Sequence, residues 1–258
     1  MTQNQIKAWP RILAEGAAII VSILLAFSID AWWEGREEDK RGQLYLLGLR
    51  EDIIQIEDEL GEHIDFITGV MKDAEKVLTM ATGTDAELLT DSFSKTLGNT
   101  YSISSTNLST PTYHDIINSG NLRLVKNSVL RMKMAKMVEL LKTINDQYDV
   151  INENYWRHHA PFVDKHFVVS KFDWFSGTTT EFSGTTTEVS RERAKIIGKL
   201  PETPFNIDVS AVRTREFWNL IYDLITTHGD QLGPTIEART LCRELLLMLD
   251  EEIGRPRL

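Results

Sequence analysis

Residues 12–33 read ILAEGAAIIVSILLAFSIDAWW, and the position of the rest of the chain depends on this stretch. As a helix it would extend about 33 Å at about 1.5 Å per residue, enough to cross a bilayer core of about 30 Å. Trp9 precedes the stretch and Trp32 and Trp33 close it, at the two levels where indole rings favour a membrane interface. The sequence therefore predicts a transmembrane anchor at 12–33, with residues 1–11 as a short N-terminal tail.

Two other interpretations of residues 12–33 stay open from the sequence. In a secretory signal peptide, Lys7 and Arg11 would form the basic region, and Ala26-Phe27-Ser28 would pass as a small-x-small cleavage site. The stretch can also be a buried helix of a soluble protein, because apolar runs of about 10–14 residues often have that role. We favour an uncleaved anchor, because the helical pattern continues through the supposed cleavage site into the next segment.

Small and polar side chains follow one face of this predicted helix, namely Glu15, Ala18, Ser22, Ala26 and Asp30. Steps of three or four residues place them on one side of a helix. Small residues at this spacing let a second helix approach closely, and polar ones can hydrogen-bond across the contact. We expect this face to pack against a partner membrane protein or a second copy of the chain. Glu15 and Asp30 lie near the two ends, where they can instead reach the lipid headgroups.

Composition narrows the classes of protein that fit the rest of the chain. Of 258 residues, 42% are apolar, as in folded domains, and the net charge is −10. No basic face is available for phosphates, so a nucleic-acid partner is not expected. Cys242 is the only cysteine, which excludes an intramolecular disulfide and predicts a buried, inert thiol. Lys7 and Arg11 favour a cytoplasmic tail and a body outside the cytoplasm, although basic residues follow the anchor as well.

Helical periodicity dominates residues 34–258. Between 34 and 80, apolar residues recur at steps of three and four without a proline, and the anchor can continue directly into this helix. A second seam, from Leu130 to Tyr155, has the same steps and is expected to pack along the first. The fold class is therefore all-α, with an N-terminal transmembrane helix continuing into an elongated antiparallel helical bundle. We predict long helices at 34–80, 128–160 and 211–253, short helices near 85–97 and 111–119, and a loop-rich insertion at about 161–205.

Glycine and proline mark the expected interruptions. Gly98-Asn99 is expected to close the helix near 85–97, and Pro161 to end or kink the second long helix. Gly229 and Gly233-Pro234 predict a kink or a break in the last one. Residues 175–188 read FSGTTTE twice, which indicates an exposed loop or hairpin that tolerated a small duplication.

With these segments placed, the chain resembles an uncharacterised family of bacterial membrane proteins with one N-terminal anchor. The resemblance covers most of residues 12–160, and a weaker helical match runs from Phe217 to Ile253. It implies an anchor followed by a helical body in a bacterial inner membrane, and brings no activity, substrate or catalytic residue. The chain departs from the family in the FSGTTTE duplication and in Gly233-Pro234. Three passages carry the likeness: Glu15-Gly16 to Ile29 with Trp33-Glu34, Leu44-Tyr45-Leu46 to Leu49-Arg50-Glu51-Asp52, and Tyr113 with Ser119-Gly120-Asn121-Leu122 and Leu124-Val125-Lys126-Asn127.

The sequence offers few candidates for catalytic, metal-ligating or ligand-binding residues. The sequence lacks a Gly-rich phosphate loop and the motifs of zinc proteases and serine hydrolases. No histidine follows a glutamate by three residues, as a di-metal carboxylate bundle requires. No catalytic residue, cofactor or metal site is therefore expected. The remaining ligand candidates are Tyr113, at the start of a short helix, and His158, His159 and His166 near Asp164. A polar helix end explains the grouping of these histidines more simply than a metal site does.

Three functions remain open from the sequence. The first is an interaction or assembly subunit of a membrane complex, without catalytic activity. The second is a ligand-sensing bundle outside the cytoplasm that signals through a partner membrane protein. The third, an enzyme with an unrecognised site, is the least favoured because enzyme motifs are missing.

Overall fold

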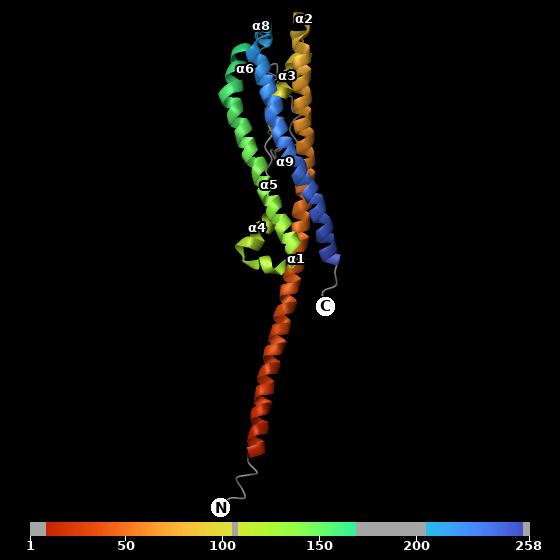
Figure 1. Cartoon of the computed structure of the whole chain (residues 1–258), viewed down its shortest axis with the longest axis vertical. Helices are drawn as coiled ribbons and strands as arrows, with labels where there is room; N and C mark the ends of the chain where they lie inside the picture. The colour runs from red at the N-terminus through yellow and green to blue at the C-terminus, as the bar shows by residue number, and fades with distance from the viewer. Residues whose placement is uncertain (1–8, 105–107, 169–204, 255–258) are drawn as a thin grey trace, which may run out of the picture.

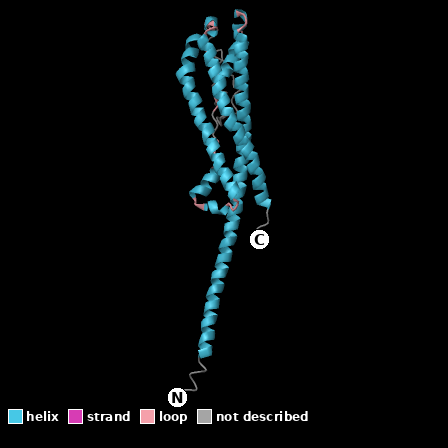
Figure 2. Cartoon of the chain, viewed as in Figure 1, coloured by secondary structure: helices cyan, strands magenta, loops and turns pink. Residues whose placement is uncertain are grey.

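The structure, a computed structural model, describes residues 9–104, 108–168 and 205–254. These ranges contain helices and no strand, so the predicted all-α class is confirmed (Figures 1 and 2). The first helix, α1 (Trp9–Ala81), has 73 residues and is about 110 Å long. Its first part extends beyond the bundle and its last part reaches the far end of it (Figure 1). Residues 12–33 and the predicted helix at 34–80 are therefore parts of one continuous helix.

The elements after α1 run along the bundle in alternating directions (Figure 1). The chain descends through α2 and α3 and forms α4 and the 3-10 helix η1 at the end of the bundle nearest residues 12–33, here called the apolar segment. It then ascends through α5 and descends again in α9. The bounds are α2 (Asp85–Leu88), α3 (Asp91–Thr100), α4 (Pro111–Asn118), η1 (Asn121–Leu124), α5 (Ser128–Asn154), the π-helical turn η2 (Tyr155–His159), α6 (Ala160–His166), α8 (Val209–Val212) and α9 (Arg215–Gly254).

The last long helix, α9, is the central element of the bundle. It lies antiparallel to both α1 and α5 and packs along both (Figure 1). Ion pairs bridge the two contacts, for example Arg50 of α1 with Asp250 at 2.7 Å and Lys136 of α5 with Glu237 at 2.5 Å. The expectation that the second seam packs along the 34–80 helix is wrong in this respect, because α5 lies chiefly along α9.

Two apolar clusters fill the bundle, and a polar layer separates them. The proximal cluster, nearer the apolar segment, contains Leu46, Leu49, Ile53, Ile56 and Leu60 of α1, Leu130, Met134, Met137, Leu141 and Ile144 of α5, and Ala238, Leu241, Cys242, Leu245 and Leu249 of α9. The distal cluster contains Ala74 and Val77 of α1, Phe93 and Leu97 of α3, Phe162 and Val163 of α6, and Phe217, Ile221 and Leu224 of α9. Between them lies the polar layer, His63 of α1 with His228, Gln231 and Thr235 of α9, all buried, and the buried apolar Ile67 and Val70 of α1 lie in the same interval.

Local hydrogen bonding explains where two of the helices begin and end. The Asn127 side chain accepts hydrogen bonds from the amides of Val129 and Leu130 at 3.0 and 3.1 Å, which caps the start of α5. Pro111 occupies the first turn of α4, where its missing N–H costs nothing. Gly120 follows α4 with a φ of 70°, a left-handed conformation that glycine adopts without steric cost. The predicted helix at 111–119 is confirmed to within one residue.

Pro161 does not end the second long helix. The chain stays helical to His166, and a π-helical turn over Tyr155–His159 precedes the proline. Proline lacks an N–H and crowds the carbonyl four residues earlier, and a wider turn at this place accommodates both effects. The predicted insertion at 161–205 therefore begins after α6. Residues 169–204, which include the FSGTTTE duplication, lie outside the described residues.

The last helix is also less interrupted than predicted. α9 continues without a break through Gly229 and Gly233-Pro234. Pro234 has no N–H for the carbonyl of Asp230, four residues earlier, and the Gln147 amide of α5 donates to that carbonyl at 3.4 Å. A neighbouring helix thus supplies a donor where the proline removes one. Two predicted boundaries also differ. Gly98-Asn99, expected to close a helix, lies inside α3, and the last long helix, predicted to start at 211, begins at Arg215 after the short α8.

Candidate functional site

The apolar segment of α1 is the first candidate site, because the described body leaves it uncovered. By length and composition α1 is able to cross a membrane, and none of its most apolar window is buried. Ile23, Leu24 and Leu25 are 50%, 59% and 57% exposed. A core helix of a soluble protein would bury such side chains, so the structure does not support that interpretation.

The predicted partner-facing residues lie on this uncovered segment: Glu15, Ala18, Ser22, Ala26 and Asp30. Ala26 and Leu44 are about five helical turns apart, at about 3.6 residues per turn, and so lie on one side of α1. Leu44 is 67% exposed, whereas Leu46, on the other side, is buried in the proximal cluster. The small-residue face therefore points away from the surface that α1 uses to pack on its own body.

Aromatic and charged side chains lie on α1 at the C-terminal end of the apolar segment. The guanidinium of Arg36 lies 5.5 Å from the centre of the Trp32 ring, a cation–π geometry. Just above, Glu38 pairs with Arg123 and Asp39 with Lys126, the latter at 2.7 Å. These ion pairs join α1 to η1 and to the residues just after it. The proximal end of the bundle is therefore attached to α1 within about two turns of Trp32.

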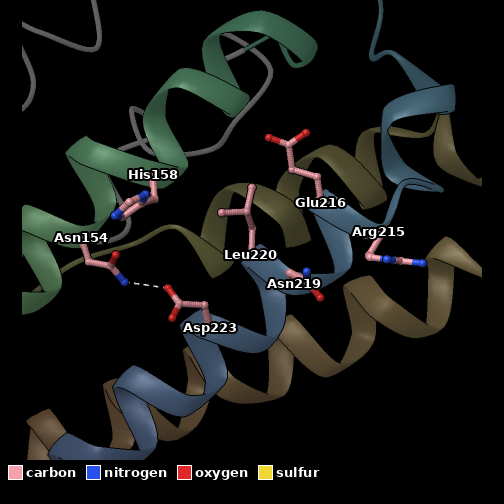
Figure 3. Close-up of a pocket in the computed structure, with 7 residues that line it drawn as sticks. All are labelled: Asn154, His158, Arg215, Glu216, Asn219, Leu220 and Asp223. Atoms are coloured by element: carbon pink, nitrogen blue, oxygen red, sulfur yellow. Dashed lines mark hydrogen bonds between the residues drawn. The ribbon is translucent and has the colours of Figure 1, made fainter.

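A second candidate site is an open pocket at the distal end of the bundle, between α9 and the end of α5 with η2 (Figure 3). Among its lining residues is Asp223, whose Oδ2 accepts a hydrogen bond from the Asn154 amide at 2.6 Å and lies 2.9 Å from Nε2 of His159. The lining combines acidic, basic and amide groups in the open, an arrangement suited to a small polar ligand. The residues that line the pocket are Asn154, His158, Arg215, Glu216, Asn219, Leu220 and Asp223.

The structure assigns different surroundings to the four ligand candidates. His158 lines the distal pocket, whereas His159 is buried beside it against Asp223. Burial lowers the pKa of His159, and Asp223 opposes that effect only in part. His166 pairs instead with Asp208 at 2.9 Å. Tyr113 packs against the proximal cluster, at the other end of the bundle. The described residues contain no group of three or more histidine, cysteine, aspartate or glutamate side chains able to hold a metal ion.

Sequence reasoning missed the polar layer. His228 stands at a position of the apolar face of the last helix, and His63 lies three residues after Leu60 and four before Ile67. A histidine at a position of the apolar periodicity was thus the sequence signal that could have indicated the polar layer. Burial lowers the pKa of both imidazoles to about 4, and no ring nitrogen of either one has a hydrogen-bond partner among the described residues.

Within residues 9–104, 108–168 and 205–254, these observations define a class: an all-α protein with one uncovered apolar helical segment, able by length and composition to cross a membrane, that continues into a helical bundle. No protein-family model, curated protein or solved structure matches the chain. The resemblance to a family of bacterial single-pass membrane proteins therefore stays a prediction.

Proposed function

We propose that this chain is a single-pass protein of a bacterial inner membrane and serves as an interaction or assembly subunit of a membrane complex. Residues 12–33 are the anchor, the body lies outside the cytoplasm, and the face with Ala18, Ser22 and Ala26 contacts a membrane helix of the partner or of a second copy. The observation that carries the proposal is the uncovered apolar segment of α1, whose small-residue face points away from the body.

The continuity of α1 supports the same function. One unbroken helix joins the apolar segment to the proximal cluster, and the ion pairs of Glu38 and Asp39 attach the body at the start of the bundle. A partner bound along the small-residue face would therefore be held in a fixed rotational position relative to the body. That coupling suits an assembly subunit.

The triple variant A18L/S22L/A26L tests this proposal. Each added side chain in a close helix contact is expected to cost about 1–3 kcal/mol. We therefore expect the complex to dissociate while the protein stays in the membrane. The measurement is the mass and composition of the full-length protein, extracted from its native membrane in mild detergent.

The chain offers a matched control on the other side of the same helix. A17L/S28L/A31L changes the same residue types, and the Ser28 hydroxyl donates to the Leu24 carbonyl at 2.7 Å much as Ser22 donates to Ala18 at 2.8 Å. We expect this variant to keep the complex. Dissociation of both variants would indicate a general effect on the segment, and an intact complex in A18L/S22L/A26L would contradict the proposal.

Ligand sensing is the second candidate function, and the distal pocket favours it. The exposed Arg215 and Glu216 at its rim offer opposite charges to a zwitterionic ligand such as an amino acid (Figure 3). A panel of free amino acids should then raise the melting temperature of the full-length protein by linkage. We expect R215A to lose that rise and R213A, outside the lining, to keep it. No shift with any amino acid would contradict sensing of this ligand class.

A further inference from the structure

The polar layer interrupts the core of the bundle at its middle. His63 and Thr235 are fully buried, and His228 and Gln231 are each 2% exposed. Apolar clusters lie on both sides of the layer along α1 and α9. Apolar side chains at His63 and His228 would extend the core here, so two buried imidazoles weaken this part of it.

Both imidazoles lack the hydrogen bonds that buried polar groups normally make. No ring nitrogen of His63 or His228 has a partner in hydrogen-bond geometry among the described residues. The Thr235 hydroxyl is used within α9, where it donates to the Gln231 carbonyl at 2.7 Å. Burial lowers the pKa of His63, and the nearby Gln231 side chain, although outside hydrogen-bond geometry, offsets only part of that effect.

The groups around the layer do not neutralise a positive charge placed there. Burial lowers the pKa of His228, and His63 of α1 and His159 of η2 lower it further, while His159 is itself hydrogen-bonded to Asp223. The acids next to His63 on α1, Glu62 and Asp65, are exposed on its outer face.

The other neighbours add no compensating charge at the layer. From α5, the neutral Gln147 reaches α9 beside the layer, where its amide donates to the Asp230 carbonyl at 3.4 Å. The nearest ion pair below is Glu57 with Arg239, in which the carboxylate already has a cation at 2.9 Å. Asp230 of α9 is exposed.

We propose that the polar layer is an acid-operated switch, in which protonation of His63 and His228 separates α9 from α1 at this level and loosens the distal half of the bundle. Two positive charges enclosed between apolar clusters repel one another and require water, which only an opened interface admits. The proximal cluster and its α1–α9 ion pairs hold the other half together.

The direction of the pH effect follows from the lowered pKa values. In the closed bundle the pKa of each imidazole is about 4, whereas an imidazole in water has a pKa of about 6.5. The open form therefore binds more protons between these values, and acid favours opening. The closed bundle keeps its full stability above about pH 6.5, and the opening equilibrium shifts by up to about tenfold per pH unit for each histidine as the pH falls towards about 4.

Hydrogen exchange on the full-length protein in detergent micelles tests this switch. Relative to about pH 7.5, after correction for intrinsic exchange rates, we expect faster exchange at about pH 5 in the distal parts of α1 and α9 and unchanged protection beside the proximal cluster. H63L/H228L should remove the acid response. H114Q/H158Q, which changes two exposed histidines, should keep it. The same acid response in H63L/H228L as in the unmodified protein would overturn the proposal.

A second measurement needs no core substitution. In NMR spectra of the unmodified protein, the ring protons of His63 and His228 should show no titration near pH 6.5 in the closed state. If the rings of His63 and His228 titrate near pH 6.5 with no loss of distal protection, no switch exists at the layer.

Discussion

The double substitution I23R/L24R is expected to release the full-length protein from the membrane fraction. Both residues lie near the middle of the apolar segment and are 50% and 59% exposed. An arginine at the centre of a membrane helix costs about 2.5–3.5 kcal/mol, so two cost about 5–7 kcal/mol. Neither side chain belongs to the apolar clusters, so the body should fold as before. Carbonate extraction followed by centrifugation measures the release, and circular dichroism measures the fold.

A matched control and a mass measurement separate the interpretations of this segment. L44R/L47R places two arginines on exposed apolar positions of α1 above the segment, and should leave the protein in the membrane. Retention of I23R/L24R in carbonate-washed membranes would contradict the anchor. The intact mass of the unmodified protein distinguishes an uncleaved anchor from a signal peptide, because cleavage after Ser28 would remove the first 28 residues.

Periodicity was enough to predict the long helices and, for α5, most of the face that is buried. The seam residues Leu130, Met134, Met137, Leu141 and Ile144 are all buried in the structure, as the steps of four and three require. Periodicity does not identify the partner of a seam, however. Several long apolar faces fit one another about equally well by sequence, so the central position of α9 emerged only from the structure.

The helix breaks that two proline signals allowed do not occur, and the physical causes are similar. Gly233-Pro234 and Pro161 predicted either a break or a kink, and both were read from the chain alone. In the structure the Gln147 amide of α5 donates to the carbonyl that Pro234 leaves without a donor, and a π-helical turn precedes Pro161. Tertiary contacts and backbone adjustments of this kind override local helix signals, and neither is visible in a single sequence.

The candidate sites were predictable to different degrees. The small-residue face of the anchor follows from spacing alone, and the structure adds that it points away from the body. His158 was found as a ligand candidate without the pocket that it lines. The polar layer depends on how α1 packs against α9, which brings His63 near enough to His228 to lower its pKa, and a single sequence does not reveal that packing.

Truncation of a core aromatic, F217A, should have the largest effect on the stability of the body. Phe217 is fully buried, and its ring lies 6.2 Å from that of Phe162 and 5.8 Å from that of Phe167. Removal of a buried phenylalanine ring typically costs about 3–5 kcal/mol, because transfer free energy and packing are both lost. Domains are typically stable by about 5–15 kcal/mol, so a large part of the stability would be lost. Urea unfolding followed by circular dichroism measures the loss.

An aromatic residue on the outside of the same helix provides the control for F217A. Tyr222 lies just over one turn away on α9 and is 56% exposed, so Y222A should change the free energy of unfolding by less than about 0.5 kcal/mol. Equal losses in the two variants would contradict the described distal cluster. Since the polar layer separates the clusters, F217A should also weaken hydrogen-exchange protection in the distal half more than beside Leu245. A uniform loss along all of α9 would mean that the bundle unfolds as one unit and that the layer does not divide it.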